Sequence, residues 1–362
     1  MKATIITLYD QKNYGNRLQN FAVQNVLETL GMEVKTISYV DKIFGPQFYL
    51  MFWFHKLTGY RFSQDPFYWR CGYLRLKKFV NFNKKYISTK WITYMDEMQR
   101  DISDYYVVGS DQVWNAEIYS MDFLKDLFLL TFCDDKKKIS FSPSFGISSL
   151  PDKWKEFFRR NLLKFQALSA REEAGVNIIE DLTGRKAELL MDPTLMLNAD
   201  DWIRIAERPV GVDDQKTFAL TYFLGDRGQE SENLVKELDQ KYHLNIYHLL
   251  DPEQPEIYIS GPREFVYLFS KAEIILTDSF HACVFAFLFG KPFLVFKRKG
   301  ENENMMSRIY TFLNTFHLQR KLVDDYSEMD RDIFEADYEN GYEILKRERE
   351  KVYRYLRESM NL

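Results

Sequence analysis

The chain has 362 residues, 46% of them apolar, and a net charge of −4, so it is large enough for two globular domains. It contains no apolar run of membrane-spanning length and no signal-peptide pattern at its start, and its three cysteines show no CxxC pairing. This composition argues against an integral membrane protein, a zinc site and a disulfide scaffold, and we expect reduced thiols, no metal ion and a cytoplasmic location.

Positive charge is concentrated in the first 100 residues, which contain 15 Lys and Arg against 7 Asp and Glu. A basic N-terminal part can face anionic lipid head groups or a phosphorylated substrate. The alternative is a solvated surface on which charge is unevenly spread. Peripheral contact with the inner face of the membrane is therefore one expectation from the sequence, whereas we expect no nucleic-acid partner.

Apolar, strand-like segments alternate with amphipathic segments through the first 200 residues, a pattern that is typical of a parallel α/β domain. Strands are predicted at residues 3–8, 34–40, 105–108, 138–142, 167–170 and 187–191. Helices are predicted at residues 17–30, ending at Gly31, at 154–168 and from Glu172 onward. We therefore assign residues 1–200 to an N-terminal domain.

Residues 44–69 interrupt this alternation with eleven aromatic side chains, and we treat about 44–70 as an insertion. One interpretation is an amphipathic element in a membrane interface, where Trp and Tyr are favoured. The other is a pair of helices whose aromatic side chains fill core space against the first sheet. We favour the second because the stretch also contains Gln, Asp, His and Pro.

The strand and helix alternation restarts after a boundary near residues 197–209. Strands are predicted at 217–223, 245–250, 273–277 and 293–296, and helices at 230–242, 262–270, 281–289 and 306–316. A highly charged helix follows at 338–357. We therefore assign residues 201–335 to a C-terminal domain and 336–362 to a terminal helix that we expect to pack back on the N-terminal domain.

Two apolar segments end in clusters of small and polar residues, VVGSDQVWN at 107–115 and ILTDSFH at 275–281. In open α/β sheets, ligands bind just beyond the carboxyl ends of parallel strands. The two segments lie in different predicted domains. We therefore expect two sheets that present polar groups to one cleft, as in an enzyme.

Five motifs along the chain, taken in order, resemble those of the polysaccharide pyruvyl transferase family. They are NYGN at residues 13–16 with Gln19, VGSDQVWN at 108–115, SARE at 169–172, MDPT at 191–194, and TDSFHA at 277–282 with GKP at 290–292. The resemblance extends from about residue 3 to about residue 320. It implies a fold similar to GT-B glycosyltransferases, with two Rossmann-like domains and parallel sheets facing a cleft.

The same resemblance implies that phosphoenolpyruvate is the donor substrate and that no cofactor is needed. The pyruvyl group would pass to two hydroxyls of a sugar, in a cell-surface polysaccharide or its lipid-linked precursor, and form a cyclic ketal. One departure from the family concerns the donor. Relatives carry an Arg two residues before the motif His, whereas this chain has Ser279 at that place.

Three residues are candidates for binding the anionic donor, which needs cations and oriented N–H groups. Arg171 matches an arginine that the family uses near the donor, and its alternative is a surface salt bridge with Glu172 or Glu173. Arg308 could replace the guanidinium that is missing at Ser279, which is itself a candidate phosphate ligand and helix N-cap.

His281 and Asp111 are the candidate catalytic residues. His281 follows a strand end, and imidazole titrates near neutral pH, so it is the first candidate for general acid and base; the alternative is a histidine that only hydrogen-bonds the turn. Asp111 could deprotonate an acceptor hydroxyl, or could instead be a helix N-cap. Gln112 and Asn115 are candidates for hydrogen bonds to the sugar.

The first loop provides further acceptor-binding candidates in Asn13, Gly15 and Asn16, which lie before a predicted helix whose free N–H groups could bind an anion or a sugar. The loop is not a GxGxxG dinucleotide motif, and its alternative is a turn with an Asn cap. Asp192, followed by Pro193, is interpreted as the structural exit of a strand.

Two other functions remain open at this point. One is a GT-B-like glycosyltransferase with a nucleotide-sugar donor, an alternative that the departure at Ser279 favours. The other is a non-catalytic glycan-binding member of the family. The presence of His281, Asp111 and Arg171 together argues against the second alternative.

Overall fold

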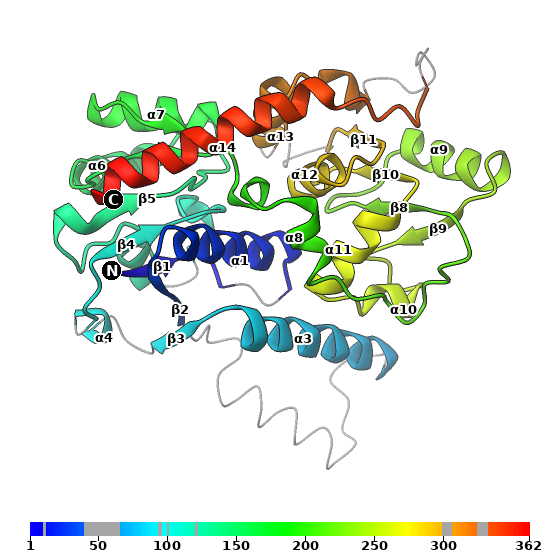
Figure 1. The fold of residues 1–362 in the computed structure, drawn as a ribbon, viewed down its shortest axis with the longest axis horizontal. Helices are drawn as coiled ribbons and strands as arrows, with labels where there is room; N and C mark the ends of the chain where they lie inside the picture. The colour runs from blue at the N-terminus through cyan, green and yellow to red at the C-terminus, as the bar shows by residue number, and fades with distance from the viewer. Residues whose placement is uncertain are drawn as a thin grey trace.

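The computed structural model describes residues 1–9, 12–39, 66–92, 96–99, 101–119, 122–298, 306–323 and 332–362. Within these residues the chain forms two parallel five-stranded sheets with helices packed around them (Figure 1). Most of the aromatic-rich insertion predicted at about 44–70 lies outside the described residues.

The sheet of the N-terminal half has the strand order β3-β2-β1-β4-β5. Its strands are β1 (Lys2–Ile6), β2 (Glu33–Tyr39), β3 (Thr89–Ile92), β4 (Tyr105–Val108) and β5 (Lys138–Ser140). A short pair, β6 (Ser169–Ala170) and β7 (Glu188–Leu189), adjoins β5 through a bridge between Ile139 and Ala167. The strand order reverses between β1 and β4, which is the topological switch point where ligands bind in such sheets.

The sheet of the C-terminal half has the order β12-β11-β10-β8-β9 and is also parallel throughout. Its strands are β8 (Phe218–Tyr222), β9 (Asn245–His248), β10 (Ile274–Thr277), β11 (Phe293–Phe296) and β12 (Leu322–Val323). The switch point here lies between β8 and β10. The two sheets confirm the predicted fold class, an α/β protein with two Rossmann-like units in a GT-B-like arrangement.

The helices lie between and around the strands, as expected for crossover connections in parallel sheets. The α-helices are α1 (Tyr14–Thr29), α3 (Pro66–Tyr86), α4 (Asp96–Gln99), α5 (Asp122–Phe128), α6 (Asp152–Leu162), α7 (Glu173–Thr183), α8 (Ala199–Ile203), α9 (Gln229–Gln240), α10 (Pro255–Tyr258), α11 (Pro262–Lys271), α12 (Phe280–Leu288), α13 (Ser307–Thr315) and α14 (Glu339–Met360). The 3-10 helices are η2 (Ala116–Ile118), η3 (Asp135–Lys137), η4 (Pro193–Met196) and η6 (Gln319–Lys321).

Helix α1 begins three residues earlier than the sequence pattern predicts. The side chain of Asn13 accepts a hydrogen bond from the Asn16 backbone N–H at 3.1 Å, so it acts as the N-cap. Gly15 and Asn16 consequently lie in the first turn of the helix and not in the loop before it. This places both residues against the carboxyl edge of the sheet.

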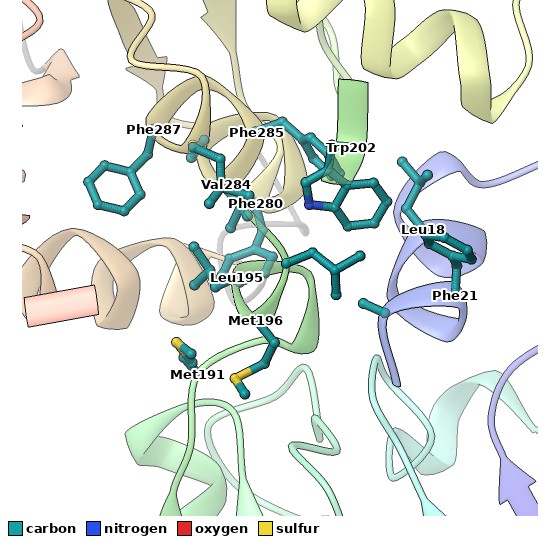
Figure 2. Packing of buried hydrophobic residues seen from close by; sticks show 14 of the residues in the cluster. Leu18, Phe21, Met191, Leu195, Met196, Trp202, Phe280, Val284, Phe285 and Phe287 are labelled. Carbon is teal, nitrogen blue, oxygen red and sulfur yellow. The ribbon is translucent and has the colours of Figure 1, made fainter. Parts of the chain in front are cut away.

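A single apolar cluster connects the two halves (Figure 2). Phe21 on α1 and Phe285 on α12 both contact Trp202, with ring centroids 5.6 and 4.9 Å away. Leu195 on η4 is buried in the same cluster. Because truncation of such buried aromatic side chains typically costs about 3–5 kcal/mol, this cluster fixes how the two sheets face each other.

Helix α14 lies across both halves of the molecule (Figure 1). Tyr342 donates a hydrogen bond to the Phe287 carbonyl of α12 at 3.0 Å, and Tyr355 donates to the Ser140 carbonyl of β5 at 2.8 Å. Between them, Arg349 donates to the Leu195 carbonyl at 2.8 Å. The helix therefore contacts the C-terminal half, the connection between the halves and the N-terminal half in turn.

Candidate active site

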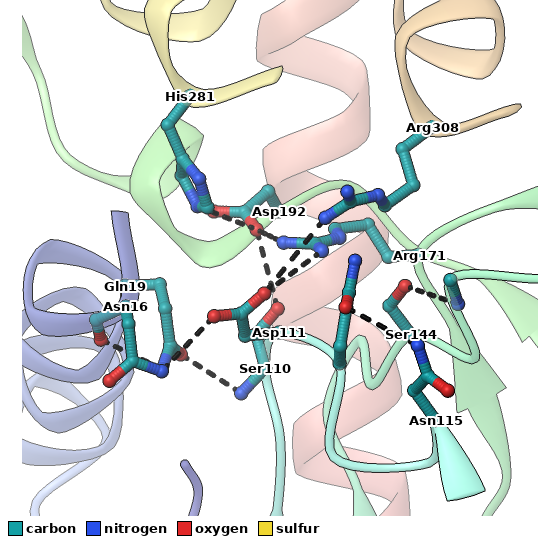
Figure 3. Close-up of polar contacts among 12 residues, drawn as sticks. Asn16, Gln19, Ser110, Asp111, Asn115, Ser144, Arg171, Asp192, His281 and Arg308 are labelled. Atoms are coloured by element: carbon teal, nitrogen blue, oxygen red, sulfur yellow. Dashed lines mark hydrogen bonds and ion pairs between the residues drawn. The ribbon is translucent and has the colours of Figure 1, made fainter. Parts of the chain in front are cut away.

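The switch points of the two sheets face each other, and a buried polar cluster lies between them (Figure 3). Asp111 follows β4, and His281 follows β10 at the start of α12. Helix α1 contributes its first turn and α13 contributes Arg308. The residues of this cluster thus come from both halves of the molecule.

Asp111 lies at the centre of the cluster. Its backbone φ is +68°, in the left-handed region that Asp tolerates better than most residues. One carboxylate oxygen accepts a hydrogen bond from the Asn16 side-chain amide at 3.0 Å, and the other lies 3.5 Å from Arg171 Nη2. Burial raises the pKa of this carboxyl, but neighbouring positive groups, chiefly Arg171, outweigh burial and hold the pKa below its usual value.

The turn that carries Asp111 is held by Gln19 of α1. The Gln19 side-chain oxygen accepts from the Ser110 backbone N–H at 3.0 Å, while its amide donates to Thr7 Oγ1 at 2.9 Å. Thr7 in turn donates to the Ser110 carbonyl at 3.1 Å. These bonds fix the backbone next to Asp111, so the carboxylate position is set by buried contacts from α1 and β1.

Arg171 and Asp192 form a fully buried ion pair at the end of the N-terminal half. Asp192 also accepts two hydrogen bonds from Thr194, from the backbone N–H at 3.0 Å and from Oγ1 at 2.6 Å. Burial opposes ionisation of Asp192, yet Arg171 and these bonds lower its pKa to about 2. Asp192 is therefore an ionised member of the cluster, and its interpretation as a structural strand exit is incomplete.

The alternative of a salt bridge from Arg171 to Glu172 or Glu173 is not what the structure shows. Glu172 instead accepts hydrogen bonds from the backbone N–H groups of Phe145 and Gly146, at 2.8 and 3.4 Å. The Arg171 guanidinium lies over the Phe280 ring, 4.7 Å from the centroid. Its Nε is buried and has no hydrogen-bond partner among the described residues.

His281 packs directly against the first turn of α1. A Cβ atom at Gly15 would lie 2.0 Å from His281 Nδ1, so only glycine fits at position 15. His281 Nε2 lies 3.8 Å from Asp192 Oδ2 and is buried without a hydrogen-bond partner among the described residues. Gly15 thus makes the close approach of the two halves feasible.

The imidazole of His281 is neutral at physiological pH in this arrangement. Burial lowers its pKa to about 4, opposed by Asp192 and Asp111 and reinforced by the charges of Arg171 and Arg308. The expectation of titration near neutral pH is therefore wrong for this state of the protein. The low pKa is caused by burial, because His281 is only 8% exposed.

Arg308 occupies the second position of α13 and reaches the same cluster. Its Nη1 lies 4.0 Å from Asp111 Oδ1. With the Gln112 amide oriented so that its oxygen faces Arg308, that oxygen accepts from Nη1 at 3.2 Å and from Nη2 at 2.9 Å. Burial and the nearby Arg171 lower the pKa of Arg308 to about 10. Arg308 Nε, like that of Arg171, is buried and unpartnered within the described part of the chain.

The structure places the remaining predicted site residues at the margin of the cluster. Asn13 is exposed and caps α1. Asn115 is buried, caps η2 by accepting from the Glu117 backbone N–H at 3.1 Å, and lies next to Gln112. Ser279 is the N-cap residue of α12, but its side chain makes no capping hydrogen bond. The cluster itself therefore contains Asn16, Asp111, Gln112, Arg171, His281 and Arg308 from the prediction.

Sequence reasoning missed a role for Gln19, Ser110 and Asp192. Ser110 Oγ donates to the Ser142 carbonyl at 2.8 Å and lies 3.3 Å from Asp192, so it connects two strand ends. A signal for Asp192 was present, because an acidic residue follows a predicted strand there just as at Asp111. Gln19 belonged to a recognised motif, but its buried partner Thr7 could not be identified without the fold.

Within the described residues, no group of three or more His, Cys, Asp or Glu side chains is placed to hold a metal ion. Nor does any described helix have the length and apolar character needed to cross a membrane. What the cluster does offer is two ionised carboxylates, a neutral imidazole and two guanidinium groups in one buried volume. The guanidinium groups can form charge-assisted hydrogen bonds with an anionic ligand, and the carboxylates and imidazole can exchange protons with it.

Three solved structures illustrate what the chain resembles over nearly its whole length. UDP-GlcNAc 2-epimerase from Neisseria meningitidis, bound to UDP-GlcNAc, shares 15% identity with a TM-score of 0.48, covering 98% of this chain and 99% of that one. The Methanocaldococcus jannaschii UDP-GlcNAc 2-epimerase shares 14% at 0.43, covering 98% and 100%. An α-glucosyltransferase in complex with UDP and DNA shares 9% at 0.46, covering 99% and 95%.

No curated protein matches the chain. The sequence profile of the polysaccharide pyruvyl transferase family matches residues 13–300. The matched region includes every residue of the buried polar cluster except Arg308 on α13. It thus contains both switch points, with Asp111 after β4 and His281 after β10.

Proposed function

Because the chain belongs to the polysaccharide pyruvyl transferase family, we propose that it transfers the pyruvyl group of phosphoenolpyruvate to two hydroxyls of a sugar and forms a cyclic ketal. The observation that carries this proposal is the pair of buried guanidinium groups, each with an unpartnered Nε among the described residues, beside His281 and Asp111. Buried donors of this kind are costly unless a ligand completes their hydrogen bonds.

Phosphoenolpyruvate carries a carboxylate and a phosphate, and Arg171 and Arg308 are the groups that would bind them. Arg308 is held by Gln112 and lies within reach of Asp111, so the second guanidinium comes from α13 and not from position 279. The departure at Ser279 therefore does not leave the site with a single arginine. This geometry supports an anionic donor.

Proton balance shows that the reaction needs a base for a hydroxyl and an acid for the donor carbon. Ketal formation adds one proton to the donor methylene carbon, removes one from each of two hydroxyls and releases phosphate, which carries away the remaining proton. Asp111, ionised in the cluster, is suited to accept a proton from the first hydroxyl. His281 would supply the proton to carbon.

His281 can do so only once it is protonated, and its low pKa in this state shows what is required. An anionic donor beside the imidazole stabilises the imidazolium and raises its pKa, because an opposite charge within a few ångströms favours the charged form. We therefore propose that donor binding and proton uptake at His281 occur together. His281 would then be able to donate a proton only when the donor substrate is bound.

The acceptor is proposed to be a sugar of a cell-surface polysaccharide or of its lipid-linked precursor. Asn16 and Gln112 lie beside Asp111 and would hydrogen-bond the hydroxyl pair, with Asn13, Gly15 and Asn115 forming the margin of the acceptor site. A lipid-linked acceptor would bring the protein to the inner face of the membrane. The excess of Lys and Arg in the first 100 residues supports peripheral contact of that kind.

A nucleotide-sugar donor is the second candidate, since Ser279 replaces the family arginine. Ligand-dependent melting separates the two, because a ligand that binds only the folded state raises the melting midpoint, by an amount that grows with the logarithm of its excess over Kd. We expect phosphoenolpyruvate to raise the midpoint and a panel of nucleotide sugars to leave it unchanged. Stabilisation by a nucleotide sugar alone would replace the proposal with a glycosyltransferase.

A further inference from the structure

The buried polar cluster is closed on the side where the two halves meet. His281, Asp111 and Gln112 are only 8%, 6% and 9% exposed, and His281 lies against Gly15 of the opposite half. A ligand that contacts these side chains must therefore reach them by another path or wait for the halves to separate. The surface around α13 and α14 provides such a path.

A pocket of about 130 Å³ extends from the groove between α13 and α14 to the two guanidinium groups. Its inner end is formed by Arg171, Asp192 and Arg308, which are all buried. Its outer end is formed by half-buried residues of the two helices, and the side walls are mainly apolar. The outer residues are Thr311, Thr315, Glu348 and Lys351, and the walls are Leu189, Leu190, Met191, Leu195, Phe280, Phe312 and Phe316.

Positive groups stand at both ends of this pocket. Lys351 donates a hydrogen bond to the Leu189 carbonyl at 2.7 Å, which holds its ammonium group near the outer end. At the inner end, Arg171 and Arg308 each have an unpartnered buried Nε within the described residues. The carboxylate of Asp192 is already taken up by Arg171 and Thr194. Lys351 also lies 3.8 Å from Glu188, and Glu348 lines the same outer end. A small anion is therefore attracted chiefly by the two guanidinium groups at the inner end.

We propose that this pocket is the entrance through which the phosphoenolpyruvate anion reaches Arg171 and Arg308, separate from the side on which the sugar binds. The inference rests on the proposed donor and adds its route. Apolar walls exclude water and strengthen the attraction between the anion and the guanidinium pair. Separate routes allow the donor to enter while the two halves are together, whereas a large acceptor requires the interdomain side to open.

The first test blocks the pocket and measures rates. Thr315→Phe fills the outer end, and Asn314→Phe places the same side chain on the exposed neighbouring position of α13. We expect stopped-flow fluorescence to show phosphoenolpyruvate association and dissociation both slowed at least about tenfold, or about 1.4 kcal/mol in each barrier, in Thr315→Phe only. Faster dissociation at an unchanged association rate would mean that the substitution merely displaces Arg308, and it would overturn the inference.

The second test changes charge at the outer end without filling it. Lys351→Glu should slow association about threefold at low salt and less at high salt, because the attraction is screened. Lys346→Glu makes the same change at an exposed position of α14 that does not line the pocket. Equal effects of the two variants, or none, would contradict the proposed entrance.

Calorimetric titration of the unmodified protein with phosphoenolpyruvate distinguishes failure of the proposed entrance from failure of the proposed donor. Binding to the unmodified protein with wild-type association rates in both pocket variants would remove the entrance and leave the proposed function standing. No binding to the unmodified protein would remove the proposed donor itself, and the entrance with it.

Discussion

Asp111 and Asp278 occupy equivalent places, each just beyond the strand at the switch point of its sheet, yet their partners differ. Asp278 accepts from the backbone N–H groups of Leu224 and Gly225, at 2.7 and 2.8 Å, and pairs with Arg298 at 3.0 Å. All of these partners belong to the C-terminal half. Asp111 contacts side chains from both halves, including Arg308 on α13.

The partners of each carboxylate distinguish one that holds a turn in place from one that belongs to the buried polar cluster. The backbone N–H groups of Leu224 and Gly225 both donate to the Asp278 carboxylate, which fixes the turn after β8. These hydrogen bonds and the Arg298 contact use both oxygens of the carboxylate for the fold. Asp111 is contacted by the Asn16 amide and by two arginines, Arg171 and Arg308, whose buried Nε atoms have no partner among the described residues. Equivalent positions in related sheets thus have different surroundings, and we propose that Asp278 serves the fold whereas Asp111 serves ligand chemistry.

The comparison is tested most strongly by removing each charge in turn. We expect Asp111→Asn to lower the rate of pyruvyl transfer by about 10²–10⁴-fold, the usual contribution of a general base, with a melting temperature close to that of the wild type. The rate is measured as transfer from radiolabelled phosphoenolpyruvate to the polysaccharide fraction. Asp278→Asn is the matched control. An equal loss of rate in both variants would show that Asp111 has no catalytic role that Asp278 lacks.

The pH dependence of stability tests whether the cluster holds His281 neutral. The pKa of His281 is lowered from 6.5 to about 4, so the unfolded state binds the proton more tightly. Its contribution to stability is complete above pH 6.5 and is lost as the pH falls toward 4, by about 3 kcal/mol in all. We expect urea unfolding to show a shallower loss over this range in His281→Gln than in the wild type.

His243, which is exposed in the segment after α9, provides the control for that measurement. His243→Asn should keep the full pH dependence of the wild type. An identical pH profile in the wild type and in His281→Gln would mean that His281 is not held neutral by burial.

The arginines that accompany the two carboxylates provide the third test. Arg308→Ala should weaken phosphoenolpyruvate binding by about 1.5–3 kcal/mol, the magnitude of a lost hydrogen bond to a charged group. Arg298→Ala, which removes the partner of Asp278, should leave the affinity within about twofold of the wild type. Calorimetric titration checks both, and an unchanged affinity in Arg308→Ala would exclude it as the replacement for the guanidinium missing at Ser279.

The smallest expected effect is on stability, when the Asp278 carboxylate is removed. Asp278→Ala leaves two backbone N–H groups without their acceptor, and we expect the free energy of unfolding to fall by about 1–2 kcal/mol. Asp239→Ala, at an exposed position of α9, should change it much less. If the unfolding free energy of Asp278→Ala matched that of the wild type, the hydrogen bonds to Leu224 and Gly225 would not be what stabilises the turn.

The sequence was sufficient to predict the parallel sheets and the two strand ends that meet. The pattern of apolar residues indicates which segments are buried strands. Polar residues that follow these strands indicate the ends of the sheets at which ligands bind. Arg308 could be proposed because the family arginine was missing at Ser279. None of these inferences required knowledge of a contact between distant residues.

Features that depend on distant contacts could not be predicted. The pKa of His281 depends on its burial against Gly15, more than 260 positions earlier in the chain, and no local pattern reports that contact. Asp192 has the local signal of a capped turn, and only the fold reveals its pairing with Arg171. The amphipathic pattern starts only at Arg17, whereas α1 begins at Tyr14 because the Asn13 side chain caps its first turn.

The position of α14 also has a consequence for biosynthesis. Arg349 donates hydrogen bonds to the Leu195 and Leu197 carbonyls, and Lys351 donates to the Leu189 carbonyl. The segment that contains Asp192 is therefore fixed by residues that lie more than 150 positions later in the chain. Domains generally fold in order during synthesis, and both sheets can therefore form on the ribosome before this segment is secured. A nascent chain that stops short of α14 would contain the whole ionic cluster but lack the helix that fixes it in place.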